Sequence, residues 1–116
     1  MEKTIYIDEQ PIQIKSTAAT AIRYKAQFGK DYFTEIMKLY PLAKLEGKTI
    51  EELSIEDMEK LDFEVFYNLT WVLAKTANPS IPDPITWLDQ FETFPFEDIM
   101  PQLQDIITST MTSKKK

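Results

Sequence analysis

The chain has 116 residues, a formal net charge of −6, seven phenylalanines, five tyrosines and two tryptophans, but neither histidine nor cysteine. Without these two residue types, Ser-His-Asp and Cys-His catalysis, Cys/His zinc sites and disulfide frameworks are excluded. The two glycines cannot form a phosphate-binding glycine-rich loop. The composition therefore predicts a non-enzymatic protein that binds a partner and needs no cofactor or metal.

The length predicts a single domain, residues 1–110, followed by a flexible lysine-rich tail at residues 111–116. No apolar run approaches the roughly 20 residues that cross a bilayer, and the first residues lack the apolar stretch of a secretory signal. We therefore expect a cytoplasmic protein without a membrane partner. The basic cluster Lys114–Lys116 does not form the basic stripe of a duplex-binding protein, so we also expect no nucleic-acid partner.

The N-terminus has the pattern of a short β-hairpin. Thr4–Asp8 and Ile12–Lys15 are rich in β-branched and aromatic residues, and Glu9–Pro11 separates them as the predicted connector. Apolar residues alternate with polar ones in both segments, which predicts one covered face. The isoleucines of that face are Ile5, Ile7, Ile12 and Ile14.

Two short helices are predicted next. The first runs from Ala18 to Phe28, with Ser16 or Thr17 as its N-cap and Gly29 at its C-terminal end. Asp31 can cap the second helix, and Pro41 prevents its continuation. The residues spaced to form its apolar stripe are Phe33, Ile36, Met37 and Tyr40.

Seven carboxylates lie between Glu51 and Glu64. Ser54 and Asp57 resemble a capping box, and carboxylates near a helix N-terminus stabilise it through the helix dipole. We interpret the acidic segment in this way. A metal site or a carboxylate pair for glycosidic acid–base chemistry is the less favoured alternative, because no Asp-x-Asp-x-Asp-Gly loop is present.

The segment from about Met58 to Ala77 predicts one helix that is apolar on two faces. The first face comprises Met58, Leu61, Val65, Leu69 and Val72, with Phe66 and Leu73 beside it. The second comprises Phe63, Tyr67, Trp71 and Ala74. A helix of this kind either lies at the centre of its fold or offers its second face to a partner, and the pattern leaves both possibilities open.

Three prolines in Asn78–Pro84 predict a rigid, extended bend. Asp83 and Pro84 then have the order of an N-cap and a first helical residue, ahead of a short helix with Trp87, Leu88 and Phe91. A last helix follows, and Thr108–Lys116 is expected to be frayed. Its apolar face comprises Phe96, Ile99, Met100, Leu103, Ile106 and Ile107, and Pro101 lies either in its first turns or at a kink.

The predicted fold is therefore α+β and mainly α-helical, with an N-terminal β-hairpin followed by a compact bundle of about four to five helices. Aromatic side chains are favoured anchors in protein contacts. The candidate partner-binding residues are Phe63, Tyr67, Trp71, Trp87, Phe91 and Phe94, and each of them could instead belong to the core.

Two blocks of small and aromatic residues resemble a known family. The first block comprises Ser16–Thr20, Arg23-Tyr24 and Phe28–Asp31, and the second comprises Trp71–Lys75, Asn78–Pro82 and Trp87–Phe91. Together with the hairpin, they resemble the tail assembly chaperones of long-tailed phages and prophages of Gram-positive bacteria. The resemblance extends from the hairpin to about Leu103. It departs from the family at Ala21, where a proline is common, and this departure implies a different helix start.

The resemblance implies a non-enzymatic assembly factor. Such chaperones bind the tape measure protein, a very long helical chain, keep it soluble and leave as the tail tube polymerises around it. It further implies self-association, a location in the cytoplasm of the bacterial host and absence from the mature virion. Many of these chaperones also have a frameshift-extended form. Lys114–Lys116 could mark such a frameshift, or form a solvated basic tail.

Two other functions remain open at this stage. The first is a small acidic adaptor or inhibitor protein, for example a DNA mimic, whose carboxylates would form one continuous surface. The second is a carboxylate-based hydrolase, which would need two carboxylates across a cleft and a raised pKa on one of them. No spacing in the sequence points to such a pair.

Overall fold

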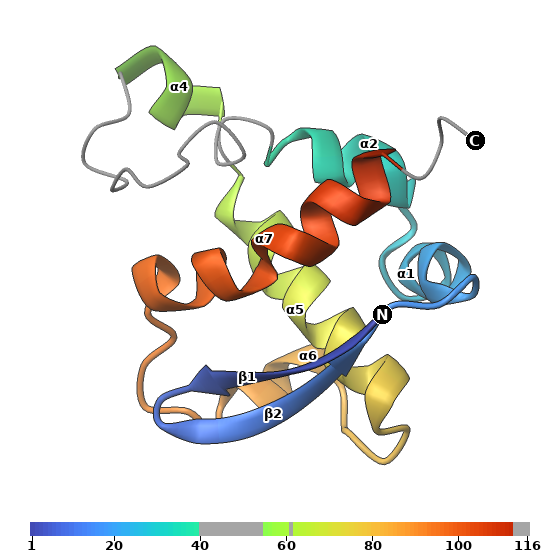
Figure 1. Ribbon diagram of the computed structural model, residues 1–116, viewed down its shortest axis with the longest axis vertical. Coiled ribbons are helices and arrows are strands. Elements are labelled where there is room, and N and C mark those ends of the chain that lie inside the picture. Colours follow the sequence, from blue (N-terminus) through green and yellow to red (C-terminus); the bar gives the residue numbers. More distant parts are fainter. Residues whose placement is uncertain (40–54, 61, 113–116) are drawn as a thin grey trace.

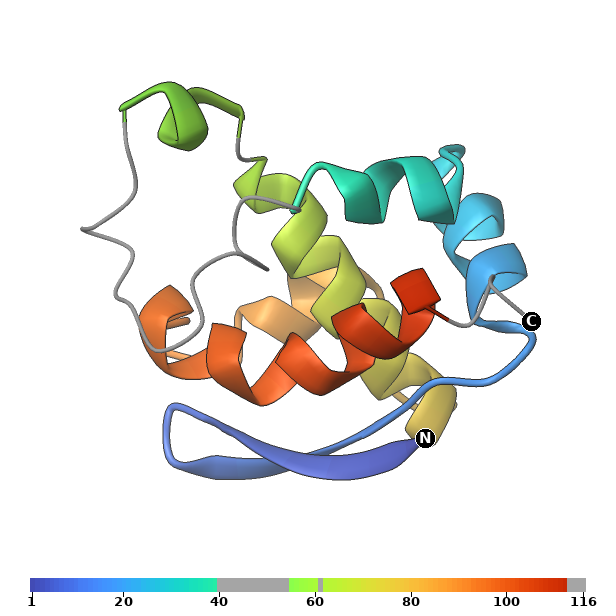
Figure 2. The ribbon, with the colours of Figure 1, turned by 45° about the horizontal axis from the view of Figure 1, so that its top comes forward.

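The computed structural model describes residues 1–39, 55–60 and 62–112 of the chain. The hairpin lies along one side of the molecule, α7 runs beside its first strand, and α5 passes through the centre, where it contacts β2, α1 and α6 (Figures 1 and 2). The predicted α+β, mainly helical fold is confirmed. The described elements are β1 (Glu2–Ile7), β2 (Gln10–Lys15), α1 (Thr20–Phe28), α2 (Tyr32–Met37), α4 (Ile55–Lys60), α5 (Phe63–Ala77), α6 (Pro84–Leu88) and α7 (Phe96–Thr112).

The hairpin turns earlier than the sequence predicts. The turn residues are Asp8 and Glu9, with φ angles of 52° and 65°, and Ile7 pairs with Gln10. Two consecutive positive φ angles are those of a type I′ turn, whose twist matches that of the strands. The predicted connector Glu9–Pro11 was therefore wrong, because Pro11 lies within β2, opposite Tyr6.

The predicted covered face of the hairpin is confirmed. Ile5, Ile7 and Ile14 are fully buried, and Ile12 is half-buried opposite Ile5. Each isoleucine contributes roughly 1.5–3 kcal/mol when fully buried, so this face fixes the register of the hairpin against the helices.

The C-terminal end of α1 lies where the sequence predicts it, but the N-terminal end does not. Gly29 ends the helix with a φ of 71°, as predicted. The helix begins at Thr20, two residues later than predicted, and Ala19 makes no side-chain cap. The Thr17 hydroxyl instead accepts a hydrogen bond from the Ala19 N–H at 3.1 Å, and the Thr17 N–H donates to the Thr20 hydroxyl at 2.8 Å. These bonds hold a turn ahead of the helix.

Helix α2 is capped by Asp31, as predicted, because the Asp31 carboxylate accepts a hydrogen bond from the Thr34 N–H at 2.9 Å. Its predicted apolar stripe is confirmed only in part, because Ile36 is buried and Phe33 packs against the core. Met37 is 55% exposed, and Tyr40 lies outside the described residues. Compared with the predicted orientation, the helix is rotated about its axis, so that the carboxylate of Glu35 is buried on its inner face. That face comprises Tyr32, Glu35, Ile36 and Leu39.

The predicted helix from Met58 to Ala77 is interrupted. α4 ends at Lys60, and α5 begins at Phe63 after Asp62, whose carboxylate accepts a hydrogen bond from the Glu64 N–H at 3.0 Å. Asp62 has an extended backbone, so the helix cannot continue through it. Parts of the predicted pattern lie outside the described residues, namely Glu51, Glu52, Ser54, Leu61 and the side chains of Asp57 and Met58.

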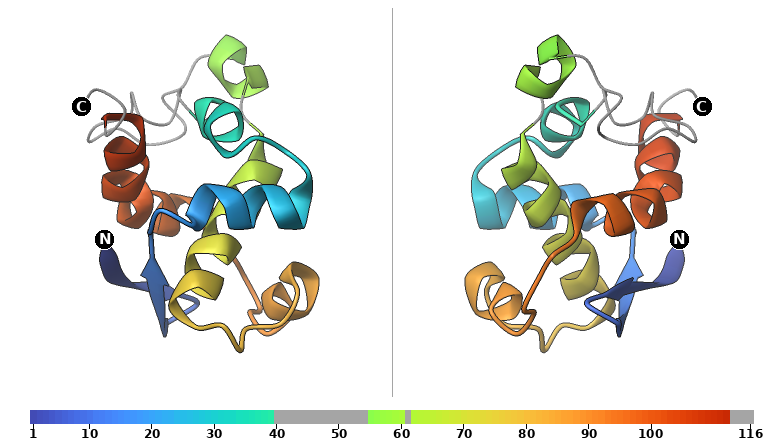
Figure 3. Two further views of the ribbon diagram at one scale, coloured as in Figure 1. Left: turned by 90° about the vertical axis from the view of Figure 1, so that its right-hand side faces the viewer. Right: turned by 90° about the vertical axis from the view of Figure 1, so that its left-hand side faces the viewer.

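Helix α7 runs to Thr112, so residues 108–112 do not belong to a frayed tail, and residues 113–116 lie outside the described part. Pro101 is inside the helix and beyond its first turn. A proline there removes an intrahelical hydrogen bond and bends the helix. Figure 3 shows the corresponding change of direction along α7.

Candidate partner-binding surface

The six candidate contact residues divide into two groups by burial. Trp71, Trp87 and Phe91 are only 3%, 2% and 7% exposed. Phe63 and Tyr67 are 40% and 38% exposed, and Phe94 is half-buried between these extremes.

The buried group belongs to the core. The Trp71 ring meets Phe28 edge-on at 5.7 Å between ring centroids, and its indole N–H donates to the Pro82 carbonyl at 2.8 Å. Trp87 and Phe91 pack together at 5.2 Å. For these three rings the structure answers the question that the sequence left open, because their surface is already covered within the chain.

The more exposed rings lie over the start of α5 as two aromatic pairs, which buried Phe66 links. Phe63 packs against Phe96 at 4.9 Å between ring centroids, and Tyr67 packs against Phe94 at 5.0 Å. Buried Phe66 lies beneath and contacts Phe94 at 5.5 Å and Phe96 at 4.6 Å. We call Phe63, Tyr67, Phe94 and Phe96 the aromatic surface.

Sequence reasoning had assigned Phe96 only to the inner face of the last helix. It is half-buried and lies at the first position of α7. The run Phe94-Pro95-Phe96 was the available signal, because a proline between two aromatic residues at a helix start keeps both rings close to the turn.

Charged residues hold another flank of the same helix start. Lys30 lies 3.5 Å from the Glu64 carboxylate, and the Lys38 ammonium lies 3.9 Å from Asp62 and 2.7 Å from buried Glu35. The hydrogen bond to Glu35 raises the pKa of Lys38 above its ordinary value. Lys30, between α1 and α2, and Lys38, just after α2, thus contact the start of α5, although exposed ion pairs contribute only about 0–1 kcal/mol each.

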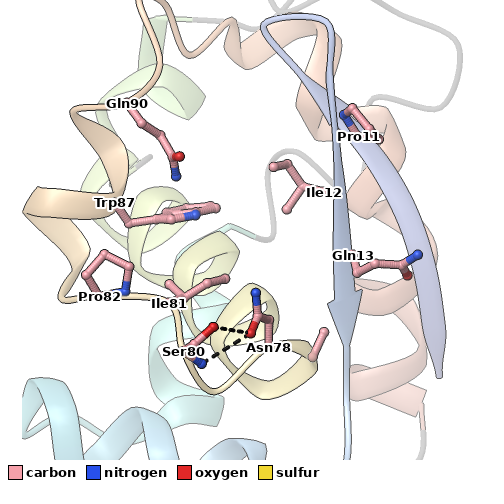
Figure 4. A pocket seen from close by; sticks show the side chains of 10 residues that line it. Pro11, Ile12, Gln13, Asn78, Ser80, Ile81, Pro82, Trp87 and Gln90 are labelled. Atoms are coloured by element: carbon pink, nitrogen blue, oxygen red, sulfur yellow. Dashed lines mark hydrogen bonds between the residues drawn. The ribbon is translucent and has the colours of Figure 1, made fainter.

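A second surface feature is a groove of about 570 Å³ between β2 and the bend that follows α5 (Figure 4). Half-buried Ile12 and Ile81 and buried Trp87 form its apolar floor. The uncharged polar residues that line it are Gln13, Asn78, Ser80 and Gln90. We call this feature the β2 groove.

The bend is fixed by polar contacts with α5 and with its own residues. The Lys75 ammonium donates to the carbonyls of Pro79 at 2.7 Å and Ile81 at 2.6 Å. The predicted cap at the start of α6 is confirmed, since the Asp83 carboxylate accepts from the Thr86 N–H at 3.1 Å. These bonds hold the wall of the β2 groove in one conformation.

Two further observations concern metal binding and membrane spans. Among the described residues, no group of three or more Asp, Glu, His or Cys side chains is placed to hold a metal ion. No helix in the described part is both long enough and apolar enough to span a bilayer.

In the comparisons with known proteins, no family model, curated protein or solved structure matches the chain.

Proposed function

We propose that the protein is a non-enzymatic phage tail assembly chaperone that binds the long helical tape measure protein and keeps it soluble during tail morphogenesis. The observation that carries the proposal is the aromatic surface, where Phe63 and Tyr67 remain 40% and 38% exposed at the start of α5. The resemblance of the two sequence blocks to the tail assembly chaperones names the partner.

The chemistry of the aromatic surface suits a helical client. Large, flat rings bury much area at a low cost in side-chain entropy, and they are common anchors in grooves that accept an apolar helix face. A long client with an exposed apolar face would aggregate if it were not covered. A net charge of −6 on each bound subunit would keep the complex soluble by mutual repulsion.

The proposal includes the remaining expectations from the resemblance. The protein would act in the cytoplasm of the bacterial host, associate with itself along the client, associate with a frameshift-extended form of itself, and leave before the virion is complete. Lys114–Lys116, the sequence feature linked to the extended form, lies outside the described residues.

Co-expression with a tape measure protein tests the proposal. The double variant Phe63→Ser/Tyr67→Ser removes the exposed rings, whereas Ile22→Ser on α1 is a matched control, because Ile22 is an exposed apolar residue away from the aromatic surface. We expect the wild type and the control to keep the client soluble and to co-purify with it, and the double variant to lose both effects.

Two outcomes would count against different parts of the proposal. A client that stays insoluble with the wild type would contradict the chaperone function. A double variant that solubilises the client as well as the wild type would leave the function standing and remove the aromatic surface from it.

The acidic adaptor gains no comparable support. Asp62 and Glu64, from the predicted acidic segment, each face a lysine, and Asp83 caps a helix. Displacement of a nucleic acid from a nuclease or repressor by the purified protein would revive that alternative.

A further inference from the structure

We propose that the outer edge of β2 is a docking site for an extended, uncharged segment of a partner protein, which adds to the hairpin as a third strand. This site is separate from the aromatic surface and does not depend on the proposed function.

The register shows which backbone groups of β2 face outward. The Met1 amino group donates to the Ser16 carbonyl at 3.0 Å, and the Ser16 N–H donates to the Met1 carbonyl at 2.8 Å. In an antiparallel ladder, pairs that exchange hydrogen bonds alternate with pairs that do not. Counting along the register from Met1 and Ser16, Gln13 and its partner Thr4 form a pair without hydrogen bonds between them. The N–H and C=O of Gln13 therefore point away from β1.

At Tyr6 the outer edge of β1 confirms this register and is covered by α7. The Gln102 side chain of α7 accepts from the Tyr6 N–H at 2.8 Å and donates to the Tyr6 carbonyl at 3.1 Å. Tyr6 therefore faces outward, as the alternation requires. Its partner Pro11 must face outward too, which explains why a residue without an N–H is tolerated within β2.

The outer edge of β2 has no such cover. Within the part of the chain that the structure describes, no group forms a hydrogen bond with the outward N–H or C=O of Gln13. The β2 groove begins beside this residue. Figure 4 shows the Ile12 side chain directed toward Trp87 across the groove, while the Gln13 side chain points the other way. A strand placed here would meet free backbone groups above an apolar floor.

The opposite wall of the groove is prepared for binding. The carbonyls of Pro79, Ile81 and Pro82 already accept hydrogen bonds from Lys75 and Trp71, so the bend does not compete for the backbone of the incoming strand. A wall fixed in advance reduces the ordering cost of binding.

The chemistry of the groove selects the occupant. Its lining residues are apolar or uncharged polar, in a chain whose net charge is −6. An extended segment with one apolar side chain on the floor, flanked by uncharged residues, matches this lining and pairs with Gln13 by main-chain hydrogen bonds. Pro11 offers a carbonyl but no donor, so it limits the paired length. If β2 of a second copy of the chain docked here, the bend of that copy would have to occupy the same space as β2. A single extended segment is therefore favoured over a second copy as the occupant.

A panned peptide library tests the site. A random nonapeptide library displayed on phage is panned against the full-length protein, and the enriched peptides are synthesised and titrated by fluorescence anisotropy. Gln13→Pro deletes the outward N–H and is compatible with the strand, as Pro11 shows. Gln13→Ala retains the N–H and is the matched control. We expect Gln13→Pro to weaken binding about tenfold or more, and Gln13→Ala and Phe63→Ser/Tyr67→Ser to bind like the wild type.

A second measurement uses only the wild-type protein, so it stands even if Gln13→Pro fails to fold. N-methylation of successive peptide amides should abolish binding at alternate positions, because only every second amide of an added strand faces β2. The proposal is overturned if no peptide is enriched, if the peptides bind folded Gln13→Pro unchanged, or if N-methylation has no alternating effect. It is also overturned if the wild type sediments as a dimer that Gln13→Pro dissociates, since a second copy would then occupy the edge.

Discussion

The two halves of α5 share one apolar pattern but have different surroundings. In the second half, Trp71 and Ala74 are buried between α1, β2 and the bend. In the first half, Phe63 and Tyr67 continue the same face and remain partly exposed, with Phe96 packed against Phe63 and Phe94 against Tyr67. A helix that is apolar on two faces therefore combines a core segment with a surface segment.

The two halves also depend on different forces. The second half is held by apolar burial, which changes little with salt or pH. The start of the helix is held on one flank by charged contacts, Lys30 with Glu64 and Lys38 with Asp62. Such contacts are screened by salt and lost when a partner changes its charge. The surface that we assign to a partner thus borders these charged contacts, while Val65 and Phe66 of the same half are buried in the core.

The largest expected effect contrasts two aromatic residues of this helix. Trp71→Ala should lower the free energy of unfolding by about 3–5 kcal/mol, because it leaves a large cavity and an unpaired Pro82 carbonyl. Tyr67→Ala should cost about 1 kcal/mol or less. Urea unfolding of both variants checks this, and similar losses would mean that the two halves are equally important to the core.

The next effect is a loss of folding stability at high pH, caused by Tyr24 of α1, which lies beside Glu35 of α2. Burial and the charge of Glu35 raise the pKa of the Tyr24 hydroxyl above its ordinary value of 10.0. Above pH 10 the unfolded chain releases this proton while the folded chain keeps it, so stability falls as pH rises. The stabilisation is fully present below pH 10, and about 1 kcal/mol should be lost by pH 11.

Tyr24→Phe provides the control for this prediction. It should be less stable at pH 8, because the hydrogen bond of 3.1 Å to Glu35 is lost, but its stability should fall less between pH 8 and 11. Part of the decline should persist, because Lys38 also has a raised pKa and its stabilisation is lost in the same direction. Parallel curves for the variant and the wild type would contradict the assignment to Tyr24.

A smaller effect is expected at the bend beside the buried half of α5. Lys75→Met removes the hydrogen bonds to Pro79 and Ile81 while keeping the apolar part of the side chain, and should cost about 1 kcal/mol. Hydrogen exchange at the Ile81 amide should accelerate. Lys25→Met, at an exposed position of α1, should change neither quantity, and an equal change in both variants would show that Lys75 does not fix the bend.

The smallest expected effect is at the start of α6. Hydrogen bonds from the hydroxyl and N–H of Thr86 lower the pKa of Asp83 below its ordinary value of 3.8. The stabilisation from Asp83 is present above pH 3.8 and is lost as the pH falls through the lowered pKa. Asp83→Asn can still cap the helix but does not titrate, so the difference in unfolding midpoint between it and the wild type should narrow below pH 3.8.

Features set by a few neighbouring residues could be predicted from the sequence. Gly29 ends a helix with a positive φ, and Asp31 and Asp83 cap helices, because each depends on hydrogen bonds or backbone angles within about four residues. The alternation in the hairpin likewise identified its buried face. Prediction from neighbouring residues failed where the same segment allowed two structures. The sequence around Asp62 fits either a continuous helix or a helix start, and in the structure Asp62 is the N-cap of α5.

The candidate site was only partly predictable for a related reason. The sequence identified aromatic rings on two faces of one helix, but periodicity carries no information about which neighbours cover each ring. Both Trp71 and Phe63 have an aromatic ring packed against them, Phe28 and Phe96 respectively, but Trp71 ends up 3% exposed and Phe63 40% exposed. The groove beside β2 was not predictable at all, since its two walls are separated by more than sixty residues along the chain.

The sequence alone determined the class of fold, the caps of α2 and α6, the bend and the absence of the residue types that catalysis most often uses. These follow from backbone preferences and composition, which act at short range. Only the tertiary structure decided which face of α5 is covered, which side of α2 turns inward and which edge of the hairpin stays open. Those outcomes depend on burial and hydrogen-bond partners brought together from distant parts of the chain, and such contacts form only when the helices and the hairpin pack.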